Sequence, residues 1–177
     1  MREIKTPMSD EVIGSLNSGD MVTISGKIYT ARDAAHKEIA ALMEAGKKAP
    51  FDFEGQAVFY AGPAPAKPGR PIGSVGPTTA GRMDLYAPML ISKGLKVMIG
   101  KGLRSKEVVD AIVSYRGIYF AAIGGVAALM AKRVVSARVI AFEELGTEAV
   151  MELEVDKLPL VVAIDSRGRN IYEKRFI

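Results

Sequence analysis

Two threonines, an arginine and an aspartate stand close together between Gly76 and Asp84, and side chains of these types can bind an anion. Arg82 can offer two parallel donors to a carboxylate or a phosphate, and Thr78 and Thr79 can offer hydroxyl groups. An apolar pattern resumes at Leu85, so the polar residues are expected where a loop enters a helix and where backbone N–H groups are unpaired. The same residues would also suit a threonine-capped helix with a solvated arginine, and the pattern alone leaves both interpretations open.

Three side chains in other segments could contribute to such a site. Lys101 lies between two glycines, shortly before a helix that Ser105 would cap, and a glycine-rich backbone can approach a ligand closely. Arg32 stands near the start of an expected helix, where a cation opposes the helix dipole, and His36 follows one turn later on the same face. Lys101 and His36 have simpler alternatives, because an exposed lysine improves solubility and a lone helical histidine often belongs to the core. The turn around Lys101 is too short for a Walker loop, so nothing supports binding of a nucleoside triphosphate.

The composition limits the chemistry that this chain can perform alone. It has 177 residues, 49% of them hydrophobic and 25% charged, which predicts a single domain with a sizeable core. The absence of cysteine excludes disulfides, thiolate metal sites and ligation of an iron–sulfur cluster by this chain. His36 is the only histidine, so a site built from several histidines is excluded, and we predict no metal site in the chain.

Charge and hydropathy argue against two classes of partner. The net charge of +4 is modest, and basic residues are scattered among acidic ones instead of forming the stripe typical of nucleic-acid-binding proteins. No apolar stretch approaches the length that spans a membrane, and no apolar run follows a basic start. We therefore expect a cytoplasmic protein without a nucleic-acid or membrane partner.

Alternating patterns predict the elements that must hold these residues. Runs rich in β-branched residues predict strands at 21–26, 27–29, 56–60, 96–100, 117–123, 134–142, 151–155, 160–165 and 170–172. Apolar residues at helical spacing predict helices at 31–46, from about 85, from Ser105 onward and at 126–132, with a break at Gly124-Gly125. Frequent Pro and Gly between 61 and 81 predict a long loop that leads from a strand to the polar cluster. This order predicts an α/β fold with mixed sheets and helices packed on one side.

The segment at 76–84, Gly-Pro-Thr-Thr-Ala-Gly-Arg-Met-Asp, resembles a signature of iron–sulfur-dependent hydro-lyases. These are the class I fumarases and L-tartrate dehydratases, and the resemblance is to their C-terminal domain or separate beta subunit. Other segments agree in order and spacing: Ser25-Gly26 through Ala31-Arg32-Asp33-Ala34-Ala35-His36, Lys101-Gly102-Leu103-Arg104-Ser105, Gly124-Gly125-Val126-Ala127-Ala128, and Leu145-Gly146-Thr147-Glu148-Ala149-Val150 followed by Leu158-Pro159-Leu160. The resemblance extends from Gly19 to Tyr172, and five ordered motifs are far more specific than one.

The resemblance implies a division of labour between two polypeptides or domains. A Cys-bearing alpha subunit would hold a [4Fe-4S] cluster through three cysteines, and this chain would not ligate it. The chain would adopt a swivelling β/β/α fold that closes the active site against the cluster domain, as one domain over 1–177 whose residues 1–18 form an N-terminal extension or contact the partner. A heterotetramer is expected, or a homo-oligomer when the chain is isolated.

The resemblance also implies roles for individual residues. Arg32, Arg82 and Lys101 match positions that bind the carboxylates of a dicarboxylate substrate, and Thr79 lies beside them. Thr78 matches the residue proposed as the catalytic base, and Lys101 is assigned with it to the catalytic group.

Three residues in the matched motifs are further candidates for the site, namely His36, Gly81 and Asp84. The chain departs from the family at two positions. Leu103 stands where the family often has asparagine, and Pro88 interrupts a helix that normally lacks proline. Neither departure changes a matched side chain.

We predict that the assembled enzyme reversibly hydrates fumarate to (S)-malate. The alternatives are an L(+)-tartrate dehydratase beta subunit and, from another class, a non-catalytic carboxylate-binding module. A threonine hydroxyl is a poor base at neutral pH, so Thr78 could act as one only if Lys101 or Arg82 stabilised its alkoxide. Otherwise Thr78 would position the substrate or stabilise an aci-carboxylate intermediate.

Overall fold

A closed ring of five strands forms the centre of the protein. The computed structural model describes residues 1–122 and 127–173. Four consecutive strands of the ring are parallel, and the fifth, the long strand β7, closes it by pairing antiparallel with the first and the last of them. The ring strands are β2 (Met21–Thr30), β3 (Ala57–Phe59), β4 (Val97–Gly100), β5 (Ile118–Ala121) and β7 (Val150–Ile164).

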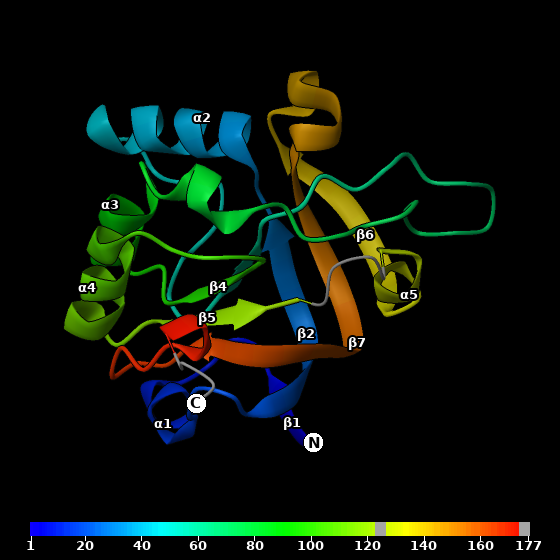
Figure 1. The fold of residues 1–177 in the computed structure, drawn as a ribbon. Coiled ribbons are helices and arrows are strands. Elements are labelled where there is room, and N and C mark those ends of the chain that lie inside the picture. The colour runs from blue at the N-terminus through cyan, green and yellow to red at the C-terminus, as the bar shows by residue number, and fades with distance from the viewer. Residues whose placement is uncertain (123–126, 174–177) are drawn as a thin grey trace.

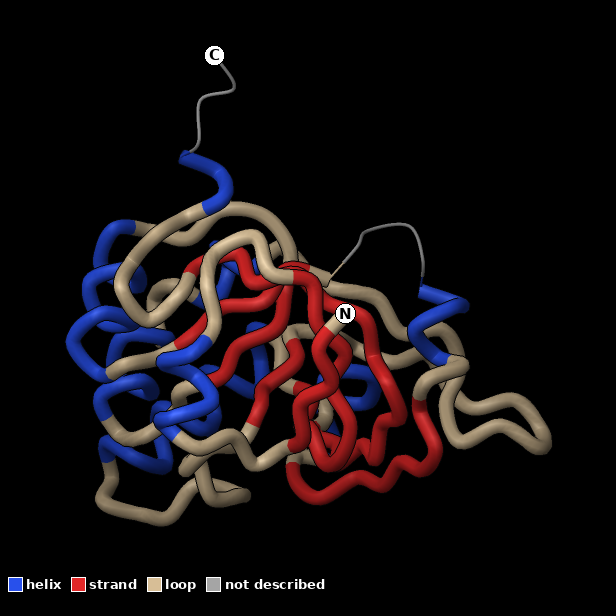
Figure 2. Tube along the Cα trace, turned by 90° about the horizontal axis from the view of Figure 1, so that it is seen from below, coloured by secondary structure: helices blue, strands red, loops and turns tan. Residues whose placement is uncertain are grey.

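Two further strands extend the sheet outside the ring. Strand β1 (Arg2–Lys5) pairs with the first part of β2, on the edge that β3 occupies farther along. Strand β6 (Val134–Ala141) pairs with the first part of β7, on the edge that β5 occupies farther along. All seven described strands therefore belong to one mixed sheet that folds back on itself (Figures 1 and 2).

Apolar side chains form one core inside the ring and a second between the ring and the helices. The inner core includes Ile28, Phe59, Ile99, Phe120 and Leu153, all almost fully buried. Strands β3, β4 and β5 are buried on both faces, as is usual for parallel strands under helices, which explains their unbroken apolar runs.

The three helices α2, α3 and α4 cover one side of the ring (Figure 1). Their bounds, with those of the smaller helices, are α1 (Asp10–Ser15), α2 (Asp33–Glu44), η1 (Ala80–Met83), α3 (Ala87–Ser92), α4 (Lys106–Tyr115), α5 (Ala127–Ala131), η2 (Glu143–Glu148) and η3 (Ile171–Glu173). The Ser105 side chain accepts a hydrogen bond from the Val108 N–H, so the predicted cap of α4 is confirmed. Pro88 stands in the first turn of α3, where its missing N–H costs nothing, so it does not interrupt the helix.

The prediction of an α/β domain with a mixed sheet is confirmed, but several elements differ. The two segments at 21–29 form one strand, and so do those at 151–165, because β2 and β7 pair with each other over most of their length, with one register shift between Ile24 and Gly26. The predicted strand at 170–172 is wrong, since only Asn170 bridges to Ile164 and η3 follows. The predicted break at Gly124-Gly125 lies outside the described residues.

The first 18 residues pack on the inner core. Ile4 of β1 and Ile13 and Leu16 of α1 are nearly fully buried there. Among the described residues, no helix combines the length and the apolar character needed to cross a membrane.

Candidate active site

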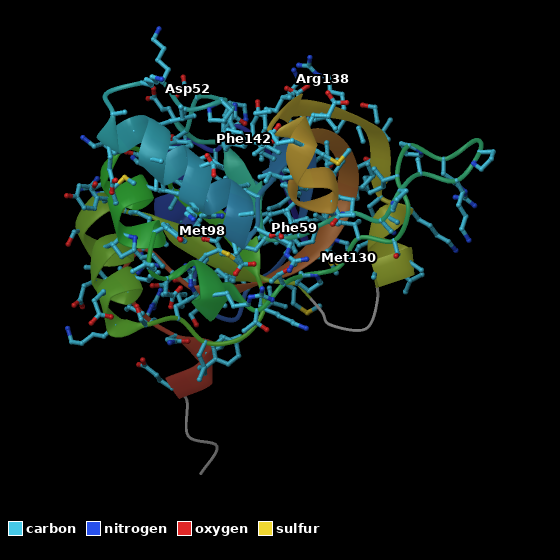
Figure 3. The ribbon with its side chains drawn as sticks, turned by 90° about the horizontal axis from the view of Figure 1, so that it is seen from above. Asp52, Phe59, Met98, Met130, Arg138 and Phe142 are labelled. Atoms are coloured by element: carbon cyan, nitrogen blue, oxygen red, sulfur yellow. The ribbon has the colours of Figure 1, made fainter. Side chains whose placement is uncertain are left out.

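The candidate residues gather at the carboxyl ends of the parallel strands. Arg32 follows the end of β2 by two residues, and Lys101 follows directly after β4. The segment that contains Thr78 reaches the same end, because the Thr78 N–H donates to the carbonyl of Tyr60, just beyond β3, at 2.6 Å. This is the end of the ring over which α2 and η2 lie side by side (Figure 3). Parallel strands present their carboxyl ends at one edge, which is where α/β proteins usually bind ligands.

Backbone hydrogen bonds hold the two threonines against Lys101. Thr79 and Lys101 form an isolated parallel bridge, in which the Lys101 N–H donates to the Thr78 carbonyl at 3.3 Å and the Ala80 N–H to the Lys101 carbonyl at 2.8 Å. A Cβ atom at Gly100 would lie 2.9 Å from a ring carbon of Tyr60 and 3.1 Å from the Cβ of Ala80. Gly100 is therefore explained by the close packing of these segments and not by the approach of a ligand.

Asp33 links the two arginines of the site. The Arg82 Nε donates to one Asp33 oxygen at 2.9 Å, and the Arg32 guanidinium lies 3.7 Å from the other. The Arg32 Nε also lies 3.7 Å from a carboxylate oxygen of Glu148 in η2. Arg32 is the N-cap of α2, so its charge still lies at the positive end of the helix dipole, and the acidic Asp33 in the first turn offsets part of that cost.

A glycine makes room for the Arg32 side chain. A Cβ atom at Gly62 would lie 3.1 Å from the Arg32 Cδ, 3.3 Å from its Nη1 and 2.9 Å from the carbonyl of Thr147. Within the described part of the chain, the Arg32 Nε is buried without a hydrogen-bond partner, although a carboxylate oxygen of Glu148 lies 3.7 Å away. The buried Nε is closed to a ligand, whereas the Arg32 side chain as a whole keeps 25% of its surface exposed.

Sequence reasoning missed Asp33 and Glu148 as members of the site. Asp33 had a local signal, because an acidic residue suits the first turn of a helix. Glu148 lay in a matched motif, but only the fold places it beside Arg32, 3.7 Å away.

Together with Arg32, Arg82 and Lys101, the acidic residues Asp33 and Glu148 leave the site with one positive charge in excess. Lys101 forms no ion pair within residues 1–122 and 127–173, so it supplies that excess.

His36 lies behind the site and not in its open part. Its ring is buried, its Nδ1 lies 2.8 Å from the Arg32 carbonyl, and its edge faces the ring of Tyr60. Nδ1 must donate in this contact because a carbonyl only accepts. In the neutral ring Nε2 is then an acceptor, and it finds no hydrogen-bond partner among the described residues. Burial lowers the pKa of His36 from 6.5 to about 4, the Arg32 carbonyl opposes this shift, and the charge of Arg104 adds to it. The imidazole is therefore neutral at physiological pH and supports the backbone of Arg32.

The lowered pKa of His36 predicts a pH-dependent loss of stability. The unfolded chain binds a proton near pH 6.5 while the folded chain stays neutral to about pH 4, so the free energy of unfolding should fall as the pH drops across this range. The full loss is about 3 kcal/mol, since each unit of pKa difference corresponds to about 1.4 kcal/mol. We expect the free energy of unfolding, measured with urea at several pH values between 7.5 and 4.5, to fall less steeply with decreasing pH for His36→Gln than for the wild type. Equal slopes would contradict a buried neutral histidine, and the comparison cancels the carboxylates that titrate in both proteins.

Both oxygens of Asp84 are engaged inside the protein. One accepts from the Arg104 Nε at 2.7 Å and the other from the Ser105 N–H at 2.5 Å. Asp84 therefore connects the two segments that bear the site and does not present a free carboxylate. Gly81, by contrast, is exposed near the carbonyl of Leu103, which lies 3.6 Å from where its Cβ would be.

The candidate site is an open surface. Thr79, Gly81, Arg82 and Lys101 are exposed, and Thr78 is half-buried. A cavity of about 370 Å³ lies elsewhere, between the loop at 64–74 and α5, and none of the candidate residues line it. Two leucines beside the site, Leu85 and Leu103, are 82% and 64% exposed, which is unusual for large apolar side chains.

The donor set suits an anion and not a metal. Guanidinium, ammonium and hydroxyl groups predominate, and the described part of the chain contains no group of three or more His, Cys, Asp or Glu side chains placed to hold a metal ion. The residues do not fit ligation of an iron–sulfur cluster, because the chain lacks cysteine.

Comparison with known proteins places almost the whole chain within one sequence family. Residues 2–175 match the family described as Fumarase C-terminus. The anaerobic class I fumarate hydratase of Escherichia coli (strain K12) is 37% identical over 177 residues, which cover 97% of this chain and 32% of that protein. Fumarate hydratase 2 of Leishmania major is 39% identical, over 97% of this chain and 31% of that protein. The chain thus spans about a third of the length of these relatives.

A shorter relative corresponds to this chain nearly end to end. The putative L(+)-tartrate dehydratase subunit beta of Methanocaldococcus jannaschii is 40% identical over 168 residues, which cover 92% of this chain and 86% of that protein. Sequences of this type therefore occur both as part of a longer chain and as a chain of similar size.

Proposed function

Since this chain belongs to the family of the fumarase C-terminus, we propose that it is the beta subunit of a two-subunit hydro-lyase that reversibly hydrates fumarate to (S)-malate. The convergence of Arg32, Arg82 and Lys101 with Thr78 at one end of the ring carries this proposal. A dicarboxylate needs two separated cationic anchors, and arginines add oriented, bidentate contacts. The two arginines around Asp33 supply one anchor and Lys101, beside Thr79, supplies the other.

The proposed reaction needs a proton acceptor at carbon. In the dehydration direction, a base removes the proton from the carbon next to one carboxylate while hydroxide leaves the neighbouring carbon. We assign the base to Thr78, whose main chain is hydrogen-bonded to Lys101, so that the ammonium and Arg82 lie on the segments that flank its hydroxyl. These cations would stabilise the alkoxide that the hydroxyl must form. The other assignment is that Thr78 positions the substrate or stabilises the aci-carboxylate intermediate.

A partner subunit completes the proposed site. Lewis-acid assistance to the departing hydroxide is the chemistry that a [4Fe-4S] cluster supplies when bound. Because this chain has no cysteine, we assign the cluster to a Cys-bearing alpha subunit. Thiolate ligands persist in a reducing compartment, so the proposal includes a cytoplasmic location.

We further propose that the domain has the swivelling β/β/α fold, with residues 1–177 as a single unit that closes the candidate surface against the alpha subunit. The exposed Leu85 and Leu103 beside the cations support burial of this face in the assembly. A heterotetramer is the proposed state, and the isolated chain is proposed to form a homo-oligomer.

The tartrate dehydratase beta subunit is the second candidate function. The relative from M. jannaschii favours it, since that protein bears this name and has nearly the same extent. A non-catalytic module that binds carboxylates is the candidate from another class, and the same cations would serve it.

One experiment separates these functions. Hydration and dehydration are measured anaerobically with fumarate, malate and L-tartrate, for this chain alone and for its mixture with the Cys-bearing partner after cluster reconstitution. We expect activity with fumarate and malate only in the mixture. Activity confined to L-tartrate would select the second candidate. An inactive mixture with a loaded cluster, combined with calorimetric binding of fumarate to this chain, would select the binding module.

A further inference from the structure

A buried arginine, Arg104, lies beneath the candidate site. The Arg104 side chain is 0% exposed, although guanidinium groups are rarely buried unless they are paired. Its guanidinium carbon lies 5.2 Å from the centre of the Tyr60 ring and 4.9 Å from that of Tyr119. Its Nε donates to Asp84 at 2.7 Å. Burial opposes its charge, but Tyr60 and Asp84 outweigh that effect and raise the pKa of Arg104.

These contacts reach two segments of the candidate site, the one at 76–84 and the turn that follows β4 and begins with Lys101. Asp84 ends the segment that bears Thr78 and Arg82, and its second oxygen accepts from the Ser105 N–H after the Lys101 turn. The Tyr119 hydroxyl donates to the Gly102 carbonyl of that same turn at 3.0 Å.

Tyr60 extends these contacts to Thr78. Its hydroxyl lies 3.4 Å from an Nη of Arg104, and its own carbonyl accepts from the Thr78 N–H at 2.6 Å. The Arg104 guanidinium therefore contacts Asp84, Tyr60 and Tyr119. Through these three residues it is linked to the main chain of the segments that carry Thr78, Arg82 and Lys101.

The physical character of a buried ion pair explains why an arginine is used here. Replacing such a pair by apolar side chains often leaves stability unchanged, so stability alone does not account for it. A planar guanidinium fixes an orientation, because Arg104 lies over two tyrosine rings and donates to a carboxylate at the same time. An apolar side chain of similar volume would fill the space without fixing how the 76–84 segment sits against the Lys101 turn.

We propose that Arg104, through Asp84, is a positioning residue that holds Thr78 and Arg82 in register with Lys101. The inference rests on the proposed hydro-lyase function, and it assigns Asp84 to support of the site and not to contact with substrate. Small displacements of catalytic groups reduce turnover strongly, so loss of the pair should reduce kcat about 10- to 100-fold even in a folded protein.

The test compares variants of the pair with a second arginine–aspartate pair elsewhere, in which the aspartate is buried and the arginine is 52% exposed. Asp84→Asn keeps the shape and an oxygen acceptor, Arg104→Lys keeps the charge, and Arg104→Met removes both the charge and the fork. Arg169→Met is the control, because Arg169 donates through Nε to the buried Asp165 at 2.7 Å, outside the candidate site. Each variant is assayed for kcat and KM in the assembled enzyme, and for amide hydrogen exchange of the chain at Thr78 and Ala80.

We expect the Asp84 and Arg104 variants to lower kcat and to speed exchange at Thr78 and Ala80, with Arg104→Lys between Arg104→Met and the wild type. Because both residues act through one contact, the double variant Asp84→Asn/Arg104→Met should be no slower than Arg104→Met. Arg169→Met should change neither readout.

Three outcomes would overturn the inference. They are unchanged exchange in Asp84→Asn, faster exchange with wild-type kcat, and additive effects in the double variant. Asp84→Asn keeps the test decisive if Arg104→Met does not fold. An inactive wild-type assembly would instead refute the proposed function, and exchange would still decide whether Arg104 holds the two segments together.

Discussion

Replacing Thr78 by valine should lower kcat of the assembled enzyme by about two to four orders of magnitude, the range associated with loss of a general base. Valine has nearly the same shape as threonine and lacks only the hydroxyl. The main-chain bonds of Thr78 to Tyr60 and Lys101 do not involve that hydroxyl, so the segment should keep its place. The measurement is steady-state kinetics under anaerobic conditions, together with the thermal unfolding midpoint, which should change little.

Two companion variants identify the role of the hydroxyl. Thr78→Ser restores a hydroxyl and should recover most of the turnover, whereas Thr79→Val removes the neighbouring exposed hydroxyl and should act mainly on KM. Wild-type turnover in Thr78→Val would reject the base assignment. A raised KM with unchanged kcat would assign Thr78 to substrate positioning.

Replacing Arg82 by alanine should weaken transition-state binding by about 2 to 4 kcal/mol, because a charge-assisted contact to a substrate carboxylate is lost. The value of kcat/KM should therefore fall roughly 30- to 1000-fold. The bond to Asp33 uses Nε, which leaves the two Nη groups of a side chain that is 53% exposed for a bidentate contact. Arg82→Lys keeps the charge but loses the fork, so it should lie between the wild type and the alanine variant.

Arg138→Ala is the matched control for Arg82. Arg138 is also exposed and also donates through Nε to a carboxylate, Glu152 at 3.0 Å, but it lies on β6 at the outer edge of the molecule (Figure 3). Its loss removes the same net charge and the same kind of surface pair, so kcat/KM should stay near the wild-type value. Equal effects at the two positions would show that Arg82 acts only through overall charge and would remove it from the site.

Local features of the sequence are sufficient to predict many of the elements. The caps, the turn residues and the apolar spacing act between residues a few positions apart, so the start of α4 at Ser105 and the buried runs of β3, β4 and β5 follow from short segments. The same locality explains the errors. A strand at 170–172 had suitable residues, but whether a segment pairs with another depends on neighbours that a local pattern does not contain.

The family motifs let the sequence alone nominate the residues of the candidate site, whose role in binding or catalysis stays a prediction. The structure shows that the nominated cations and threonines lie at one end of the strands. Tertiary structure alone decided how they are held. Arg82 reaches Asp33 across 49 positions of sequence, and β7 closes the ring by pairing with β2 from the other end of the chain. It also decided that His36 is buried and that Asp84 is engaged by Arg104. The physical reason is that burial, pairing and pKa depend on which distant segments share a volume, and that is a property of the packed fold.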